Sequence, residues 1–386
     1  MYLVASITGN RTDSIQSKVK EDFDIERELK LLNKSPVKSI QTKFGYIVDC
    51  IDINKQPAFD HPLLTNHKLQ RKPSFQNKIR KTSVKNSSTK AIFGLEKHQC
   101  PTGTVAIRRT TKEDLIQGKS YFNNVLFEKN NVNHVAQVVL STLPNKFYYG
   151  VGGTASVYNV KVENDQSSAS MMWVRNGPIG SKNSINVGWH VSPQLYKNDA
   201  TYLFAVWTTD GYKNSGCFNY LCQGFVQTSK QVYLGVQFGH TSIYGGTPID
   251  LPLKIIQDSK TKNWWLINDG ENIGYFPASL FSNLTSADQV GWGGRTTTSL
   301  GGTSPPMGSG YFPDNVLSHA SYFIYITYRD VNGAGNNDSR ENYEPDRSLT
   351  NTFSDKPNCY TAEYYGEQDD VGHYLQFGGP GGNCGN

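Results

Sequence analysis

The sequence lacks the features that mark several common protein classes. No stretch approaches the roughly 20 apolar residues that a membrane-spanning helix needs. The motifs of P-loop nucleotide-binding proteins, HExxH metallopeptidases and GxSxG hydrolases are also missing. We therefore expect neither a membrane protein nor a member of these three classes.

Charged residues and methionine are scarce, whereas glycine and aromatic residues are plentiful. The 386 residues include only 4 Met and 18% charged residues, against 36 Gly, 22 Tyr, 18 Phe and 6 Trp. This composition favours strands and turns over helices. The length suits about two domains, or one β-sandwich with an extension.

The net charge of +5 comes from one short segment. Between Lys68 and Lys90 the chain holds eight basic residues and no acid, so the rest of the chain carries −3. The segment also contains Pro73 together with Ser, Thr and Asn, which favours a solvated linker over a polyanion-binding arm. We expect no nucleic-acid partner.

The cysteines form an even set of six. The pair Cys217 and Cys222 could be half of a zinc site, but no second Cys pair or nearby His pair completes four ligands. Disulfides are the better interpretation, although the sequence leaves other connectivities open. The expected pairs are Cys217–Cys222, Cys359–Cys384 and Cys50–Cys100.

Disulfides imply an oxidising compartment, so we expect a secreted protein. The opening MYLVASITGN is too short for a signal peptide, and we expect a leader to precede it. Glycosylation is permitted at the sequons of Asn10, Asn86, Asn283 and Asn337.

The chain divides into two parts with different patterns. In residues 1–130, charged and apolar residues from 14 to 32 follow a helical period, and 47–53 and 104–109 are typical of strands. In residues 131–386, short alternating segments separated by turn residues predict a mostly β, antiparallel, jelly-roll-like sandwich. One such segment sets Tyr322, Ile324, Ile326 and Tyr328 on one face. We expect the first part, with its basic linker 68–90, to pack separately from the sandwich.

One predicted strand, Asn183–Val191, places polar residues on a single face. Its apolar positions alternate from Ile185, so Asn186 and His190 point to the opposite side. That side could line a cleft or be an ordinary solvated face.

Two further patterns argue against a bound cofactor or metal. Residues 150–155, GVGGTA, match the dinucleotide fingerprint in letters, but no helix follows, so a Gly-rich turn is predicted. The eight His lack metal-ligand spacing, and His61, His190 and His373 are interpreted as structural or surface residues. We expect no cofactor and no metal site.

Segments in both parts of the chain resemble one family. In the first part these are residues 34–41, 49–64 and 100–110; in the second they include VGWHVSPQLY (187–196), WTTDGY (207–212), GCFNYLCQGFVQ (216–227), WGG (292–294) and FGGPGGN (377–383). In this order they resemble the neprosin family of plant glutamic peptidases, with an activation-peptide region followed by a catalytic domain. The resemblance runs from about Glu28 to the end.

The resemblance implies a β-sandwich that cuts proteins, often after proline, with two glutamates in one cleft. One carboxyl holds a proton while the other activates water in acid. In the family, one glutamate precedes the Val/Ala-Gly-Trp run and the other follows Trp-Gly-Gly. Here these positions hold Asn186 and Arg295, and neither side chain can replace a carboxylate.

Three functions are therefore weighed. The preferred one is a non-catalytic protein that keeps the cleft and binds extended or proline-rich peptide segments. The alternatives are an acid endopeptidase that uses Asp210, Asp269 or Glu271, and a carbohydrate-binding sandwich with exposed aromatic side chains. The residues expected to contribute to binding are His190, Tyr212, Trp264 and Trp292.

Overall fold

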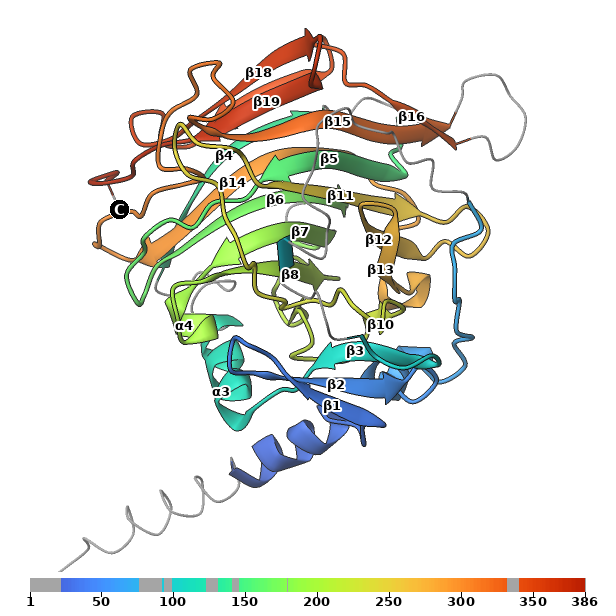
Figure 1. Cartoon of the computed structure of the whole chain (residues 1–386). Coiled ribbons are helices and arrows are strands. Elements are labelled where there is room, and N and C mark those ends of the chain that lie inside the picture. The colour runs from blue at the N-terminus through green and yellow to red at the C-terminus, as the bar shows by residue number, and fades with distance from the viewer. Residues whose placement is uncertain are drawn as a thin grey trace, which may run out of the picture.

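A computed structural model gives the fold of the chain (Figure 1). It describes residues 22–75, 92–93, 99–122, 131–140, 146–178, 180–331 and 340–385. Two large sheets account for most of the described strands, and all the pairings between their strands are antiparallel. The expected antiparallel β-sandwich is confirmed.

The larger sheet has nine strands and the smaller has seven. The nine-stranded sheet runs in the order β10 (Val226–Gln227), β13 (Glu271–Phe276), β12 (Trp264–Asn268), β11 (Asp250–Gln257), β5 (Gly150–Ser156), β15 (Ser321–Val331), β19 (Gly372–Gly378) and β18 (Thr361–Gln368), with β16 (Arg340–Tyr343) paired to β15. The seven-stranded sheet runs in the order β17 (Thr350–Ser354), β4 (Asn131–Leu140), β14 (Gln289–Ser299), β6 (Ser167–Asn176), β7 (Asn183–Val191), β8 (Thr201–Thr208) and β9 (Cys217–Phe218).

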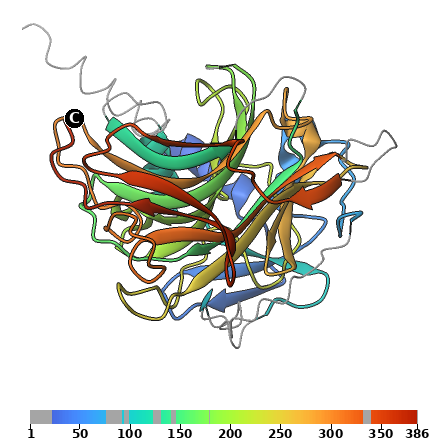
Figure 2. The ribbon, with the colours of Figure 1, turned by 90° about the horizontal axis from the view of Figure 1, so that it is seen from above.

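The core lies between the two sheets, which are seen from above in Figure 2. Two indoles of the seven-stranded sheet reach the backbone of β5 in the other sheet. Trp189 Nε1 donates to the carbonyl of Ser156 at 2.7 Å, and Trp292 Nε1 donates to that of Gly152 at 3.1 Å. Because both tryptophans are fully buried, these bonds satisfy their N–H groups while the rings fill the core.

The Gly-rich segment that was expected to form a turn is instead the buried strand β5. A Cβ on Gly150 would lie 2.9 Å from the carbonyl oxygen of Ile255, and one on Gly153 would lie 3.2 Å from Ile326. The glycines therefore serve close packing within and between the sheets rather than a reversal of the chain.

The alternation expected in β15 is broken by one residue. Tyr325 has a φ of 51°, and the pairing with β5 shifts register next to it. As a result Tyr322 and Ile324 pack in a small separate cluster, while Ile326 joins the main core. A bulge of this kind moves the following side chains to the other face.

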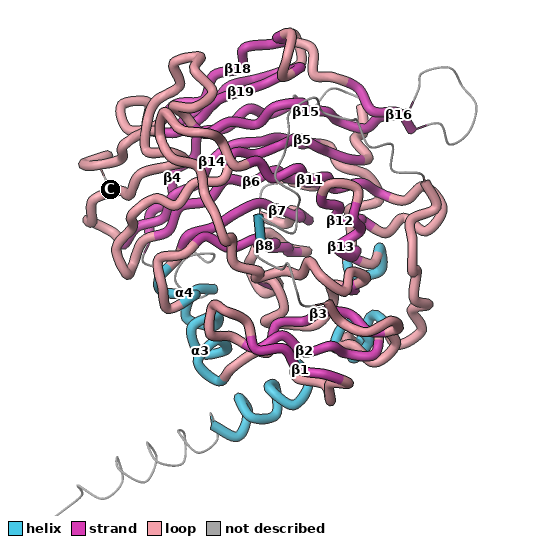
Figure 3. The backbone as a smooth tube through the Cα atoms, in the orientation of Figure 1, coloured by secondary structure: helices cyan, strands magenta, loops and turns pink. Residues whose placement is uncertain are grey.

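The N-terminal part forms a small sheet and the helices beside it. β1 (Lys38–Gln41), β2 (Ile47–Asp52) and β3 (Thr104–Arg108) pair in that order, and η1 (Pro57–Asp60) and η2 (Pro62–Leu64) follow β2. A helix over 22–32 packs Ile25 and Leu32 against Leu115 of α3 (Lys112–Tyr121). Figure 3 shows α3 and this helix near β1–β3, with the short α4 (Pro193–Tyr196) beside α3; η4 (Ala278–Leu280) follows β13.

The expectation that this part packs separately is wrong. Ile51 and Val105 belong to the same buried cluster as the sandwich core. Gln56 exchanges two hydrogen bonds with the backbone of Gln227, at 2.7 and 3.1 Å. The basic composition that suggested independence is confined to the linker, whereas the flanking strands carry an apolar face that must be buried.

The basic linker is described only up to Phe75. Lys68, Arg71 and Lys72 are exposed, but Ser74 is anchored through two hydrogen bonds to Asp258, at 2.6 and 2.7 Å. The rest of the linker, 76–90, lies outside the described residues, as do the sequons at Asn10, Asn86 and Asn337. Asn283 is exposed.

Three disulfides join the cysteines in the expected pairs, Cys50–Cys100, Cys217–Cys222 and Cys359–Cys384. Among the described residues, no helix is both long and apolar enough to cross a membrane.

Candidate functional site

Asn186 and His190 of β7 lie on the face of the seven-stranded sheet that is turned away from the other sheet, here called the cleft face; the alternate residues Ile185, Val187 and Trp189 belong to the core between the sheets. Arg295 of β14 is in register with Ala169 of β6, which is in register with His190 of β7. Asn186 lies four residues from His190 and so shares its face. The structure thus places Asn186, His190 and Arg295 on one face of the sheet, with Arg295 on β14 two strands away from the other two residues on β7.

Helix α3 covers this face with Tyr121. The Tyr121 hydroxyl lies 3.3 Å from His190 Nε2, and its ring packs edge-on against His190 and Phe218. A capping box between Thr111 and Asp114 fixes the start of the helix. The N-terminal part therefore contributes a wall of the site.

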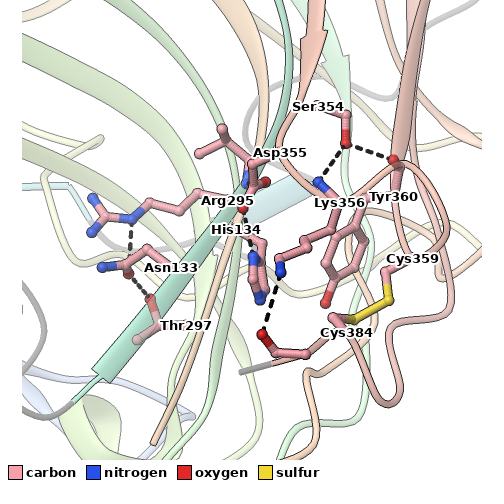
Figure 4. Close-up of polar contacts among 12 residues, drawn as sticks. Asn133, His134, Arg295, Thr297, Ser354, Asp355, Lys356, Cys359, Tyr360 and Cys384 are labelled. Atoms are coloured by element: carbon pink, nitrogen blue, oxygen red, sulfur yellow. Dashed lines mark hydrogen bonds and ion pairs between the residues drawn. A yellow bond between two sulfur atoms is a disulfide. The ribbon is translucent and has the colours of Figure 1, made fainter. Parts of the chain in front are cut away.

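A pocket remains beside Arg295 under this cover. Its lining includes Tyr121, Ser167, Ala169, Met171, His190, Phe204, Val206, Phe218, Arg295 and Thr297, and no acid is among them. Arg295 Nε donates to Asn133 Oδ1 at 3.2 Å, and Thr297 donates to the same oxygen at 2.7 Å (Figure 4). The carboxylate of Asp355, drawn in the same figure, is bound to His134 at 2.6 Å.

His190 is a neutral hydrogen-bonding group in this setting. Burial, aided by the positive charge of Arg295, lowers the pKa of His190 to about 3. Its Nδ1 is buried and has no hydrogen-bond partner among the described residues. The imidazole therefore offers one unused polar atom and stays neutral, with a single ring proton, at neutral pH.

Asn186 is surrounded by hydrogen-bond acceptors and one cation. Its amide nitrogen lies 3.2 Å from the Tyr212 hydroxyl, and its amide oxygen accepts from Arg175 at 3.4 Å. The Arg175 guanidinium lies 4.5 Å from the centre of a Trp173 ring. Burial lowers the pKa of Arg175 to about 10, so it remains protonated at neutral pH. Of the two positions that hold glutamates in the family, one is thus next to the Arg175 guanidinium and the other is itself an arginine, Arg295.

The three acids considered as replacements do not meet at this site. Asp210 caps its own loop: although burial opposes it, hydrogen bonds from Ser215 and Asn214 lower the pKa of its carboxyl. Asp269 and Glu271 lie at the β12–β13 hairpin of the nine-stranded sheet, where Glu271 accepts from Ser229. No pair of these carboxyls faces Asn186 and Arg295.

Two of the expected binding residues are corrected. Trp264 and Trp292 are fully buried, and their indole N–H groups bond the carbonyls of Leu284 and Gly152. Both therefore belong to the core. His190 and Tyr212 do lie at the cleft face.

The structure adds residues that the sequence did not point to. Arg175 could have been found, because it stands six residues from Ala169 on the same face of β6. Tyr121 and Asn133 carry no local signal, since each reaches the site from an element far away in the chain.

Family models and solved structures provide the comparisons. The neprosin model matches residues 164–380, and the neprosin activation peptide model matches residues 39–151. Two structures of scytalido-glutamic peptidase also match, each at 10% identity. The one with a transition state analog inhibitor has a TM-score of 0.28 and covers 52% of this chain and 80% of that chain. The one with a peptide-based transition state analog has a TM-score of 0.31 and covers 65% and 98%. Similarity this low supports no statement about the site.

Proposed function

This chain belongs to the neprosin family, and from that premise we propose that it is a secreted, non-catalytic member whose cleft face binds an extended, proline-rich peptide segment. Residues 1–130 act as its activation-peptide-like region and 131–386 as its catalytic-type domain. One observation carries the proposal: the residues that line the pocket beside Arg295 include one cation and several neutral polar groups but no carboxyl group.

Peptide hydrolysis by the family's chemistry needs a carboxylic acid and a carboxylate in the same cleft. Asn186 has no titratable proton, and Arg295 keeps its charge at any working pH. His190 does not supply the missing acid, because with a pKa of about 3 its imidazole is neutral at any pH well above that value. We infer that water is not activated here.

The same groups suit a ligand that is rich in acceptors. A proline-rich segment presents backbone carbonyls but few N–H groups, and it is already extended in solution. Arg295 and the unused Nδ1 of a suitable His190 tautomer can donate to such carbonyls. Phe204 and Phe218 supply aromatic surface for the proline rings. Tyr121 occupies this space, so the ligand binds when α3 moves aside.

An activity assay tests the missing chemistry. The full chain, and the chain nicked by limited proteolysis, are incubated with a proline-rich protein substrate across the acid range. We expect no cleavage by either form. The double variant Asn186→Glu with Arg295→Glu should gain acid-dependent cleavage if the family frame is intact. Turnover by the unmodified chain that disappears in Asp210→Asn would refute the non-catalytic assignment.

A binding titration tests the ligand. With a synthetic proline-rich peptide, Arg295→Ala should weaken binding by about 10-fold or more, because a charged donor is lost. The melting temperature should change little, since the half-buried guanidinium contributes little packing. Arg71→Ala, an exposed arginine of the linker, is the control. Equal binding by the two variants would exclude the cleft face as the binding site.

A further inference from the structure

Three potential metal ligands meet at the far edge of the nine-stranded sheet, away from the cleft face. Glu344 follows β16, Glu367 is on β18 and His373 is on β19 (Figure 1). One ligand atom from each lies within 4.8 Å of the other two. Glu367 and His373 are directly paired across the β18–β19 hairpin, so the backbone holds these two side chains next to each other.

The hydrogen bonds around His373 fix which ring nitrogen is available. The Tyr364 hydroxyl donates to the carbonyl oxygen of Pro345 at 2.6 Å. His373 Nδ1 lies 2.6 Å from the same hydroxyl. A phenol has a single proton to donate, so Nδ1–H must be the donor to Tyr364. In the neutral imidazole, Nε2 then carries the free lone pair.

This lone pair faces carboxylate oxygen rather than a donor. His373 Nε2 lies 3.5 Å from Glu344 Oε2, and its side chain is only 17% exposed. This distance is longer than in a direct histidine–carboxylate hydrogen bond. In the pairs His134–Asp355 and His319–Asp314 the nitrogen and oxygen atoms are 2.6 and 2.7 Å apart. Around a tetrahedral zinc ion with ligands at 2.0–2.2 Å, neighbouring ligand atoms lie about 3.3–3.6 Å apart. The spacing at His373 fits an ion between the two groups.

We propose that Glu344, Glu367 and His373 bind one divalent cation of the zinc type. Two carboxylates and a neutral imidazole balance a charge of +2, and a nitrogen ligand favours zinc over calcium or magnesium. Tyr364 is the positioning residue, because it holds the Nδ1 proton and aims Nε2 at the site. The guanidinium of Arg347 is also near this site, where it donates to the Tyr364 backbone carbonyl at 3.0 Å.

The site is independent of the cleft, and its consequence is structural. It adds a further link between the segment after β16 and the β18–β19 hairpin, which already share the bonds of Tyr364 with Pro345 and Arg347. Sequence spacing gave no sign of it: the ligands stand 23 and 6 residues apart, and no short motif places them together.

The experiment is a calorimetric titration of tag-free, chelator-treated full chain with zinc chloride at neutral pH. We expect one equivalent to bind. His373→Gln and Glu367→Gln should each weaken binding by about 10-fold or more, and Tyr364→Phe by about 10-fold. Because Glu367 is exposed, its variant keeps the test valid even if His373→Gln fails to fold.

The control is His319→Gln. His319 also faces a carboxylate but in a direct pair with Asp314, so its variant should bind zinc as the unmodified chain does. A cobalt(II) titration should show the absorption of a tetrahedral site and lose it in Glu367→Gln. The proposal is overturned if no equivalent binds below about 100 µM, or if zinc binds equally well to His373→Gln and Glu367→Gln.

Discussion

The cleft face and the far edge of the nine-stranded sheet each place a histidine among charged groups, but with charges of opposite sign. His190 lies beside Arg295 under α3, with no acid lining the described pocket. His373 lies beside Glu344 and Glu367, with its Nδ1 proton held by Tyr364. A histidine side chain is thus a very weak base at the cleft face, where its pKa is lowered, and a proposed metal ligand at the sheet edge. Its neighbours, rather than its identity, set its chemistry.

The two regions also differ in how they are shielded. The cleft face is buried by Tyr121 and aromatic neighbours, so a proton added there has no solvent to stabilise it. At the sheet edge both glutamates are exposed, so an ion can enter without any movement of the backbone. The chemistry of the cleft face therefore depends on its burial under α3, whereas cation binding at the sheet edge depends only on the side chains of the three ligands.

Removing the cover should have the largest effect. Tyr121→Ala deletes a buried aromatic ring that packs on His190 and Phe218, and truncations of this size cost about 3–5 kcal/mol. We expect faster amide hydrogen exchange in α3 and lower stability to denaturant. Ile116→Ala on the same helix is the control, because Ile116 is 40% exposed. Equal losses in the two variants would show that α3 is not docked through Tyr121.

The second largest expected effect is a loss of folding stability in acid, caused by His190 at the cleft face. The folded pKa of His190, about 3, is below its ordinary value of 6.5, so the unfolded chain binds the extra proton between these values. Stability should therefore fall as the pH drops from 6.5 toward 3, by about 1.4 kcal/mol per pH unit from this residue. His190→Gln should remove that part of the slope in urea titrations at several pH values. An unchanged slope would mean that His190 does not titrate on unfolding.

Zinc should stabilise the edge by a smaller amount. At a tenfold excess over its Kd, a ligand that binds only the folded state adds about 1.4 kcal/mol. A thermal scan with and without zinc should show this gain, and a chelator should reverse it. Glu367→Gln should lose the gain, whereas Arg295→Glu at the cleft should keep it. A gain that survives in Glu367→Gln would place the ion elsewhere.

The smallest expected effect comes from the start of α3. Thr111→Ala removes the side-chain cap and should cost about 1 kcal/mol. Asp114→Ala removes the other half of the capping box, the bond from the Thr111 N–H to the Asp114 carboxylate. In the Thr111→Ala background this second change should cost less than it does alone, because the two bonds act together. A double-mutant cycle in denaturant measures this coupling, and full additivity would contradict it.

The sequence predicted the sandwich, the disulfide pairs and the shared face of Asn186 and His190, because strand alternation and cysteine count are local signals. The prediction from alternation failed in β15, where the bulge at Tyr325 shifts the following side chains to the other face of the sheet. Trp292 was also misplaced, although Trp292 and Arg295 are three positions apart in β14 and an odd spacing sets two side chains on opposite faces. The site at His373 depends on Pro345 and Tyr364, whose contacts only a folded chain reveals.

The Cys50–Cys100 disulfide closes a covalent loop within the N-terminal part of the chain. The whole segment 76–91 lies inside the loop that this bond closes. A protease that cuts once within the loop produces two polypeptides that stay linked, and only a reducing gel separates them. Because α3 follows Cys100, a second cut beyond Tyr121 still leaves α3 bonded to β3 and, through the disulfide, to the fragment before the first cut. Nicking the chain and releasing its parts are therefore separate events.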